Sequence, residues 1–221
     1  MSDDIFITGQ WDGYIELFSI SNHQFKSTFQ TQDKKNIIEI CLIESSKDEY
    51  TFAFGDFDLG IIIGKIIMRN QFEYEFQEDK IKLIEDVSCH SMMLIKQNVI
   101  AAFVRNQDDE YQLKILDIKS RQELHTIDLN ESTYIYPALA YDYIQYPFAF
   151  IKDQNNISLI NTNNYQITTI IQCYCSFSEQ QLIQYRDQDN KYKLIDIQMY
   201  ETDEDSYEYL NEIRETEISM L

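Results

Sequence analysis

Proline and glycine are scarce, with 2 Pro and 5 Gly in 221 residues. Both residues usually build the turns of β-proteins, so a β-protein of this composition must make its turns from other residues. Asn, Asp and Gln fill the gaps between apolar runs, and Asp12-Gly13 is a typical hairpin turn. The scarcity of Gly also excludes a glycine-rich loop that could hold a phosphate group.

The chain lacks long apolar runs, a disulfide framework and an excess of positive charge. No apolar run approaches the ~18 residues that span a bilayer, and the acidic segment Met1–Asp4 has no signal-peptide pattern. The net charge of −20 disfavours nucleic acid and anionic membranes. We therefore expect a cytoplasmic or nuclear protein, whose partners are other proteins, with basic surfaces allowed. Reduced thiols are expected at Cys41, Cys89, Cys173 and Cys175.

Internal repetition is the strongest positive feature of the sequence. Residues 6–30 and 53–77 are similar at an offset of 47, which places Gly13 onto Gly60 and Phe29-Gln30 onto Phe76-Gln77. Each unit has an apolar run, an Asp/Asn-rich turn, an alternating strand, a polar turn and another alternating strand. Weaker copies cover residues 99–128, 147–171 and 182–198.

One further strand candidate lies between successive units, which gives four strands per unit. These candidates are Ile37–Ile43, Met92–Lys96, Ala138–Ile144 and Gln172–Phe177. Four strands form one blade of a β-propeller. We therefore predict an all-β fold, a single propeller over residues 1–200 with about five four-stranded antiparallel blades. The predicted blade cores lie near residues 5–30, 50–77, 92–128, 138–171 and 172–213.

The repeat resembles the WD40 family in a divergent form, over roughly residues 5–200. In that family the third strand of each repeat ends in Trp-Asp. The matching pairs are Phe18-Ser19, Lys65-Ile66, Leu116-Asp117, Ile160-Asn161 and Ile195-Asp196. Two of these pairs keep the Asp, none keeps the Trp, and the family's Gly-His pair is missing. The resemblance implies a propeller that binds other proteins.

The first unit begins at Ile5 with the equivalent of a second strand, which leaves a place for another strand at its edge. The acidic C-terminal segment 201–221 has three interpretations: a last strand at Tyr207–Ile213, a short helix over Tyr207–Arg214, or a solvated tail. In the first case Thr216–Leu221 would pair with the first unit and close the ring. A strand from a partner protein could close it instead.

Metal and nucleophile chemistry finds little support in the sequence. Cys89-His90 could form a dyad, and with Cys173 and Cys175 it could supply four zinc ligands. The usual C-x₂-C spacing is missing, however, and there is no G-x-S-x-G elbow. We therefore predict no catalytic residue, no metal and no cofactor.

The predicted function is a non-catalytic protein–protein interaction scaffold within a larger intracellular complex. A glycosidase-like hydrolase is one alternative, because five-bladed propellers can carry channel carboxylates. Its candidates are Asp56, Asp58, Asp108 and Asp189, although turn chemistry alone explains Asp at such positions. A fragment of a larger propeller protein is the other alternative. The predicted partner-binding residues are Tyr134, Tyr136, Tyr207, Tyr209 and Leu210.

Overall fold

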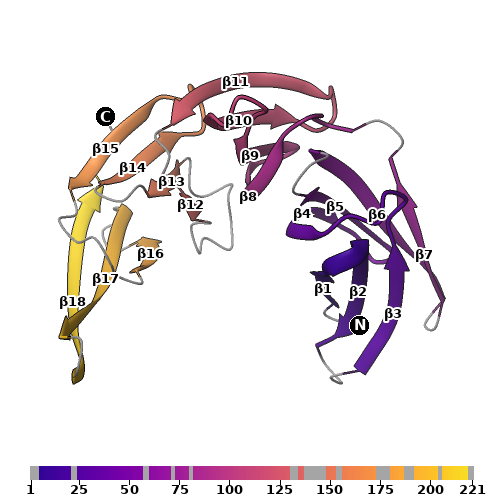
Figure 1. The fold of residues 1–221 in the computed structure, drawn as a ribbon, viewed down its shortest axis with the longest axis horizontal. Helices are drawn as coiled ribbons and strands as arrows, with labels where there is room; N and C mark the ends of the chain where they lie inside the picture. Colours follow the sequence, from indigo (N-terminus) through magenta and orange to yellow (C-terminus); the bar gives the residue numbers. More distant parts are fainter. Residues whose placement is uncertain are drawn as a thin grey trace. The chain divides into compact units, whose positions relative to one another are not determined.

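The computed structural model is built almost entirely from antiparallel β-sheet (Figure 1). It describes residues 5–20, 24–56, 60–70, 73–79, 82–129, 134–136, 148–152, 156–172, 180–186, 192–203 and 206–218. Two compact units are present, Met1–Glu131 and Ser132–Leu221. The prediction of an all-β antiparallel fold is confirmed, whereas the number of propeller blades stays a prediction.

The first unit contains three sheets, coloured indigo to magenta in Figure 1. The first sheet holds β1 (Ile5–Gly9), β2 (Tyr14–Ser19) and β3 (Gln24–Gln30), with the short helix η1 (Trp11–Gly13) between β1 and β2. The second holds β4 (Ile37–Ser45), β5 (Glu49–Asp56), β6 (Ile61–Asn70) and β7 (Glu73–Glu78). The third holds β8 (Ser88–Lys96), β9 (Val99–Arg105), β10 (Tyr111–Asp117) and β11 (Gln122–Leu129).

The second unit contains two sheets. One holds β12 (Tyr134–Tyr136), β13 (Phe148–Lys152), β14 (Asn156–Asn161) and β15 (Ile167–Gln172). The other holds β16 (Gln180–Arg186), β17 (Tyr192–Asp203) and β18 (Ser206–Ile218). In every sheet of both units, each strand pairs with the strands next to it in the sequence, as expected for successive hairpins.

The extra strand candidates have different outcomes. Ile37–Ile43 lies within β4 and Met92–Lys96 within β8, and each is the first strand of its sheet. The candidate Ala138–Ile144 lies outside the described residues, as does Gln172–Phe177 after its first residue. The two candidates that the structure describes are therefore confirmed as strands.

Two glycines that align in the repeat lie in hairpin turns, Gly13 between β1 and β2 and Gly60 between β5 and β6. Gly13 has φ +73° and Gly60 has φ +95°, in the left-handed region that other residues rarely adopt. A Cβ on Gly13 would overlap the Thr31 hydroxyl, and a Cβ on Gly60 would overlap the Ile84 carbonyl oxygen. In both cases the hairpin lies against the chain that leaves the same sheet. The sequence alignment of the two glycines therefore corresponds to a shared backbone geometry.

Two apolar clusters join the sheets of the first unit. Between the first and second sheets, Ile15 and Leu17 pack with Phe52 and Phe54. Phe76 adds ring contacts there, with centroids 6.3 Å from Phe52 and 5.7 Å from Phe29. Between the second and third sheets the cluster is built from smaller side chains, which include Cys41, Ile43, Ala53, Cys89 and Ala102. Burial of these alternate strand faces explains the period-two apolar pattern of the sequence.

The described part of the segment Thr216–Leu221 extends the last strand, and the ring closure expected of this segment stays a prediction. Thr216, Glu217 and Ile218 pair with Leu194, Lys193 and Tyr192 of β17. The hairpin of β17 and β18 is long enough for these residues to belong to their own sheet, where β18 is the last strand. Of the interpretations of the segment after residue 200, the structure has the strand, because β18 covers Ser206–Ile218.

Candidate interaction surface

The outer edge of β1 is the starting point of the candidate surface. Among the described residues, β1 pairs with β2 alone. The N–H of Gln10 donates to the Tyr14 carbonyl at 2.8 Å. Since hydrogen-bonded pairs alternate along an antiparallel ladder, the backbone groups of Ile5 and Ile7 point away from β2. β1 therefore presents backbone donors and acceptors along an edge that could accept another strand.

An apolar groove of about 460 Å³ lies beside this edge. β1 and the turn after β2 form one wall, β4 and the residues after it form the other wall, and β5 contributes Tyr50 and Phe52. Its side chains are mainly aliphatic and aromatic, with two serines on the β4 side. The lining residues are Ile5, Phe6, Ile7, Ile20, Ile40, Leu42, Ser45, Ser46, Tyr50 and Phe52.

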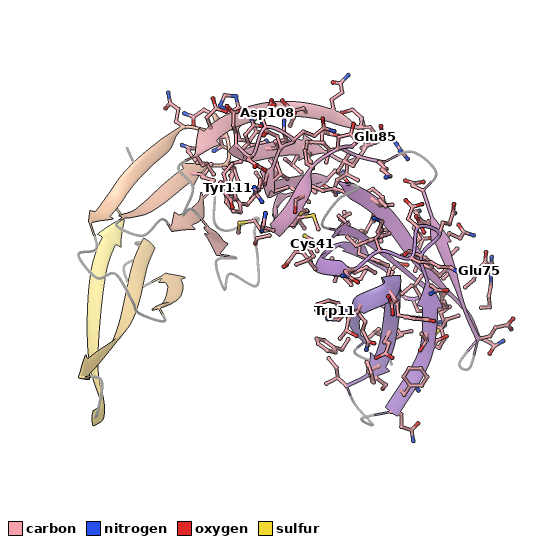
Figure 2. The ribbon with its side chains drawn as sticks, in the orientation of Figure 1. Trp11, Cys41, Glu75, Glu85, Asp108 and Tyr111 are labelled. Atoms are coloured by element: carbon pink, nitrogen blue, oxygen red, sulfur yellow. The ribbon has the colours of Figure 1, made fainter. Side chains whose placement is uncertain are left out.

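Large apolar side chains around this groove remain exposed. Phe6 is 55% exposed, Ile20 is 51% exposed and Leu42 is 49% exposed. On the same sheet, Trp11 is 79% exposed and projects from η1 (Figure 2). Phe25, whose ring packs edge-on to Phe18 at 5.6 Å, is also exposed. We call Phe6, Trp11, Ile20 and Phe25, together with Leu42 on the neighbouring strand β4, the first-sheet apolar surface.

No charged side chain that the structure describes lines the groove, but Glu39 lies on the opposite face of β4. Burial raises the pKa of the Glu39 carboxyl to about 7. Burial, followed by the charge of Glu39, raises the pKa of the Cys41 thiol to about 12. Both side chains belong to the side of β4 that faces the third sheet, where Figure 2 labels Cys41. The two faces of β4 therefore differ in polarity as well as in exposure.

The predicted partner-binding residues lie in two different sheets of the second unit. Tyr134 and Tyr136 belong to β12, where they pair with Lys152 and Phe150. Tyr207, Tyr209 and Leu210 belong to β18. The structure does not bring the two groups together within one sheet, and their role in binding stays a prediction.

The sequence predicts an open strand position at the edge of the first unit, but it does not predict the groove or its exposed apolar side chains, and its predicted partner-binding residues lie in the second unit. The available signal is that β1, the first described strand, is equivalent to β5 of the second sheet rather than to β4. In the first sheet no described strand lies beside β1 where β4 lies beside β5, so the side chains that such a strand would cover are accessible. Phe6 and Leu42 are two such side chains.

The cysteine and histidine candidates lie in the interior of the first unit. Cys41 and Cys89 are buried free thiols. The His90 ring packs 5.7 Å from the rings of Phe103 and Tyr111, and burial, together with the charge of Arg105, lowers its pKa. The other two candidate ligands, Cys173 and Cys175, lie outside the described residues. Within the ranges that the structure describes, no three His, Cys, Asp or Glu side chains group as a metal site.

The carboxylates of the hydrolase alternative do not form a described cluster. Asp56 is the last residue of β5, and Asp108 lies in the turn between β9 and β10. The N–H of Asp108 donates to Asn106 Oδ1 at 3.0 Å, which is typical of turn chemistry. Asp58 and Asp189 lie outside the described residues. A second, polar pocket of about 290 Å³ lies beside this turn, with Arg105 and Asp109 among its lining residues.

Two positions that match the Trp-Asp pair of WD40 repeats have a local structural role. The Asp117 carboxylate accepts a hydrogen bond from the Ser120 N–H at 2.7 Å, and this bond lowers the pKa of Asp117. Asn161, at the equivalent position, accepts from the Asn163 N–H at 2.9 Å. Each side chain caps the turn that leads to the last strand of its sheet. The Asp or Asn at this position is therefore explained by turn geometry.

Comparisons with known proteins give a fold and no family. No family model and no curated protein matches the chain. Raptor from Chaetomium thermophilum is similar in structure with 11% identity and a TM-score of 0.52, over 88% of this chain and 18% of the Raptor chain. A protein of unknown function from Bacteroides caccae has 7% identity and a TM-score of 0.49, over 98% of this chain and 73% of the other.

These findings bear on the fold alone. This chain spans less than a fifth of the Raptor chain, at 18% of its length. Within the described residues, the structure contains no helix with the length and apolar character that a membrane crossing requires. The similarity to Raptor and the successive antiparallel sheets fit a propeller-like fold.

Proposed function

We propose that this chain is a propeller of about five blades that works as a non-catalytic scaffold for other proteins. The observation that carries this proposal is the first-sheet apolar surface. Phe6, Ile20 and Leu42 of this surface line the same groove, and exposed apolar side chains that gather in this way are typical of interaction sites. Elsewhere among the described side chains, Leu124 on β11 is a large aliphatic residue with comparable exposure, at 41%. In the part of the chain whose side chains the structure describes, exposed large apolar residues are thus concentrated at the first sheet and at Leu42 on the neighbouring strand β4.

The residue types and the charge support binding to protein. Phe6, Trp11 and Phe25 present large rings, and aromatic side chains provide much of the binding energy at protein interfaces. The net charge of −20 favours partners that are neutral or basic at the rim of the contact. In this proposal the chain acts inside the cell as one subunit of a larger complex.

The proposal is tested by purification of the tagged full-length chain at physiological salt, followed by mass spectrometry and size measurement. We expect at least one protein in stoichiometric amount. A double variant, Trp11→Ser with Phe25→Ser, should lose part of this association, whereas Leu124→Ser should keep it. Recovery of the chain alone at several salt concentrations would overturn the proposal. Hydrolysis of a panel of glycosides by the purified chain would support the hydrolase alternative instead.

A further inference from the structure

We propose that the groove beside β1 receives an extended segment of a different protein, which pairs with β1 as the fourth strand of the first sheet. The segment has apolar side chains at alternate positions and no acidic residue. This inference rests on the proposed function, because it names the place and the chemistry of one partner contact.

The second and third sheets each have a first strand at a position that no described strand fills in the first sheet. Each has an inner strand, β4 or β8, that precedes the equivalent of β1. Cys41 and Ile43 of β4 pack against Cys89 and Met92 of β8, and all four side chains are buried. Leu42 lies on the opposite face of β4, which borders the first sheet; no described strand fills the equivalent position there, and Leu42 lines the groove. An added strand on β1 would stand against Leu42 as β8 stands against Ile43.

The edge of β1 is open over part of its length. Ile5 and Ile7 direct their backbone groups outward, whereas the site beside Gly9 is filled by the Ile37 side chain. The Ile37 N–H also donates to the Gln10 carbonyl at 3.1 Å, so β4 closes this end. A segment of about three to five residues therefore fits, close to the usual length of a short edge strand. β12 pairs with its neighbour over three residues, which shows that such a short strand suffices in this chain.

The occupant is identified by chemistry. Main-chain hydrogen bonds to an exposed sheet edge provide affinity, and pockets for alternate side chains provide specificity. The lining residues Ile5, Ile40, Leu42 and Phe52 call for aliphatic or aromatic side chains on the inward face. A second copy of this chain is disfavoured because two molecules of net charge −20 repel one another. The described strands of this chain already have places in their own sheets.

The chain itself provides a probe for the experiment. A synthetic peptide with the sequence Ser88–Lys96, carrying Cys89→Ser to prevent oxidation, represents an inner strand without acidic residues. We expect saturable binding to the full-length protein and slower hydrogen exchange in Ile5–Gly9 when the peptide is bound. A peptide of the same composition in scrambled order should not bind. The Ile37–Ser45 peptide, which has two glutamates, should bind more weakly.

Matched variants test the location. Leu42→Gln changes an exposed leucine in the groove, and Leu124→Gln makes the same change on β11. We expect Leu42→Gln to weaken peptide binding about tenfold, and Leu124→Gln to leave it unchanged. Ile20→Gln provides a second groove variant if Leu42→Gln unfolds, as judged by circular dichroism. Equal binding by the groove and control variants would overturn the inference.

Two further results would also overturn it. If Ile5–Gly9 is strongly protected from exchange before peptide is added, another part of the chain already fills the position. If Leu42→Gln converts a dimer into a monomer, the occupant is a second copy. Only an exposed edge on a monomer, protected by the peptide, supports the inference.

The outcome also separates this inference from the scaffold proposal. If the natural partner is recovered equally with wild-type protein, Leu42→Gln and Leu124→Gln, the groove inference fails and the scaffold proposal stands. If no natural partner is recovered but the peptide binds as expected, the scaffold proposal fails and the groove retains its strand-binding property. Selective loss of the partner with Leu42→Gln supports both.

Discussion

The first unit has two junctions between neighbouring sheets, one between the first and second sheets and one between the second and third. Strand β4 takes part in both, but the burial of its side chains differs between them. β4 packs against β8 on one face and borders the groove beside β1 on the other. Along β4, Cys41 is 7% exposed, Leu42 is 49% exposed and Ile43 is 9% exposed. These residues alternate between the two faces, so the difference in exposure comes from the neighbouring sheets and not from residue type. An inner strand, where present, buries the facing side chains.

The two junctions are also filled differently. The junction of the first two sheets is built around Phe52 and Phe54, with Phe29 and Phe76 packed against it. The junction of the second and third sheets contains Ala53, Ala102 and cysteines, which allow the two sheets to lie close together. Rings bury more apolar area than small side chains and can fill a wider space. The aromatic cluster therefore stabilises the first sheet even though this sheet has only three strands in the described part of the chain.

The largest expected difference in stability is between substitutions of Ile43 and Leu42, neighbouring residues that lie on opposite faces of β4. Ile43→Ala should lower the free energy of unfolding by about 2–5 kcal/mol, because it leaves a cavity between two packed sheets. Leu42→Ala should cost less than about 1 kcal/mol, because that side chain already contacts solvent. Urea denaturation followed by circular dichroism measures both values. Similar losses for the two variants would show that the groove is filled in solution and would break the comparison.

A second test compares the equivalent glycines of the first two sheets. Gly60→Ala and Gly13→Ala each place a Cβ at a left-handed backbone position, which costs about 1–2 kcal/mol. Gly60 should show the larger loss, because its Cβ would meet the Ile84 carbonyl oxygen, whereas the nearest atom to Gly13 is the hydroxyl of Thr31. Thr31→Ser keeps that hydroxyl and serves as the control. Equal thermal shifts for the two glycine variants would mean that the two hairpins have the same freedom to adjust.

Much of the strand pattern could be predicted from the sequence, because repetition and alternation depend on local chemistry. The offset of 47 placed Gly13 onto Gly60, and both have positive φ. Leu116-Asp117 was placed at the end of a third strand, and Asp117 does end β10 and cap the next turn. These features depend on a few neighbouring residues, so the pattern of residue types is sufficient to predict them.

The candidate site depended on longer-range relations that the sequence pattern does not encode. The groove arises where β1, β4 and β5 meet, and the exposure of Leu42 depends on which strand is missing from another sheet. The extent of the last strand also differs from the predicted Tyr207–Ile213, because an alternating pattern does not show that Thr216 continues the hairpin. Its partner is set by the length of the hairpin of β17 and β18.

The smallest predicted effect concerns pH and the polar side of the junction between the second and third sheets. Burial raises the pKa of Glu39 from 4.5 to about 7 in the folded protein. The unfolded chain therefore loses this proton first, and the free energy of unfolding decreases as pH rises from about 4.5 to about 7. Glu39→Gln removes the ionisable group and with it this part of the pH dependence.

We expect Glu39→Gln to match wild type near pH 4 and to exceed its stability by about 1 kcal/mol near pH 8, an amount reduced because the carboxyl retains contact with solvent. Thermal melts at several pH values measure this difference. Glu44→Gln, at an exposed position on the same strand, is the control for the loss of one carboxylate from β4. Parallel curves for wild type and Glu39→Gln would mean that water reaches Glu39 freely. In that case water would enter between the second and third sheets, as it does beside the first sheet. The two junctions would then differ only in the burial of Cys41 and Ile43.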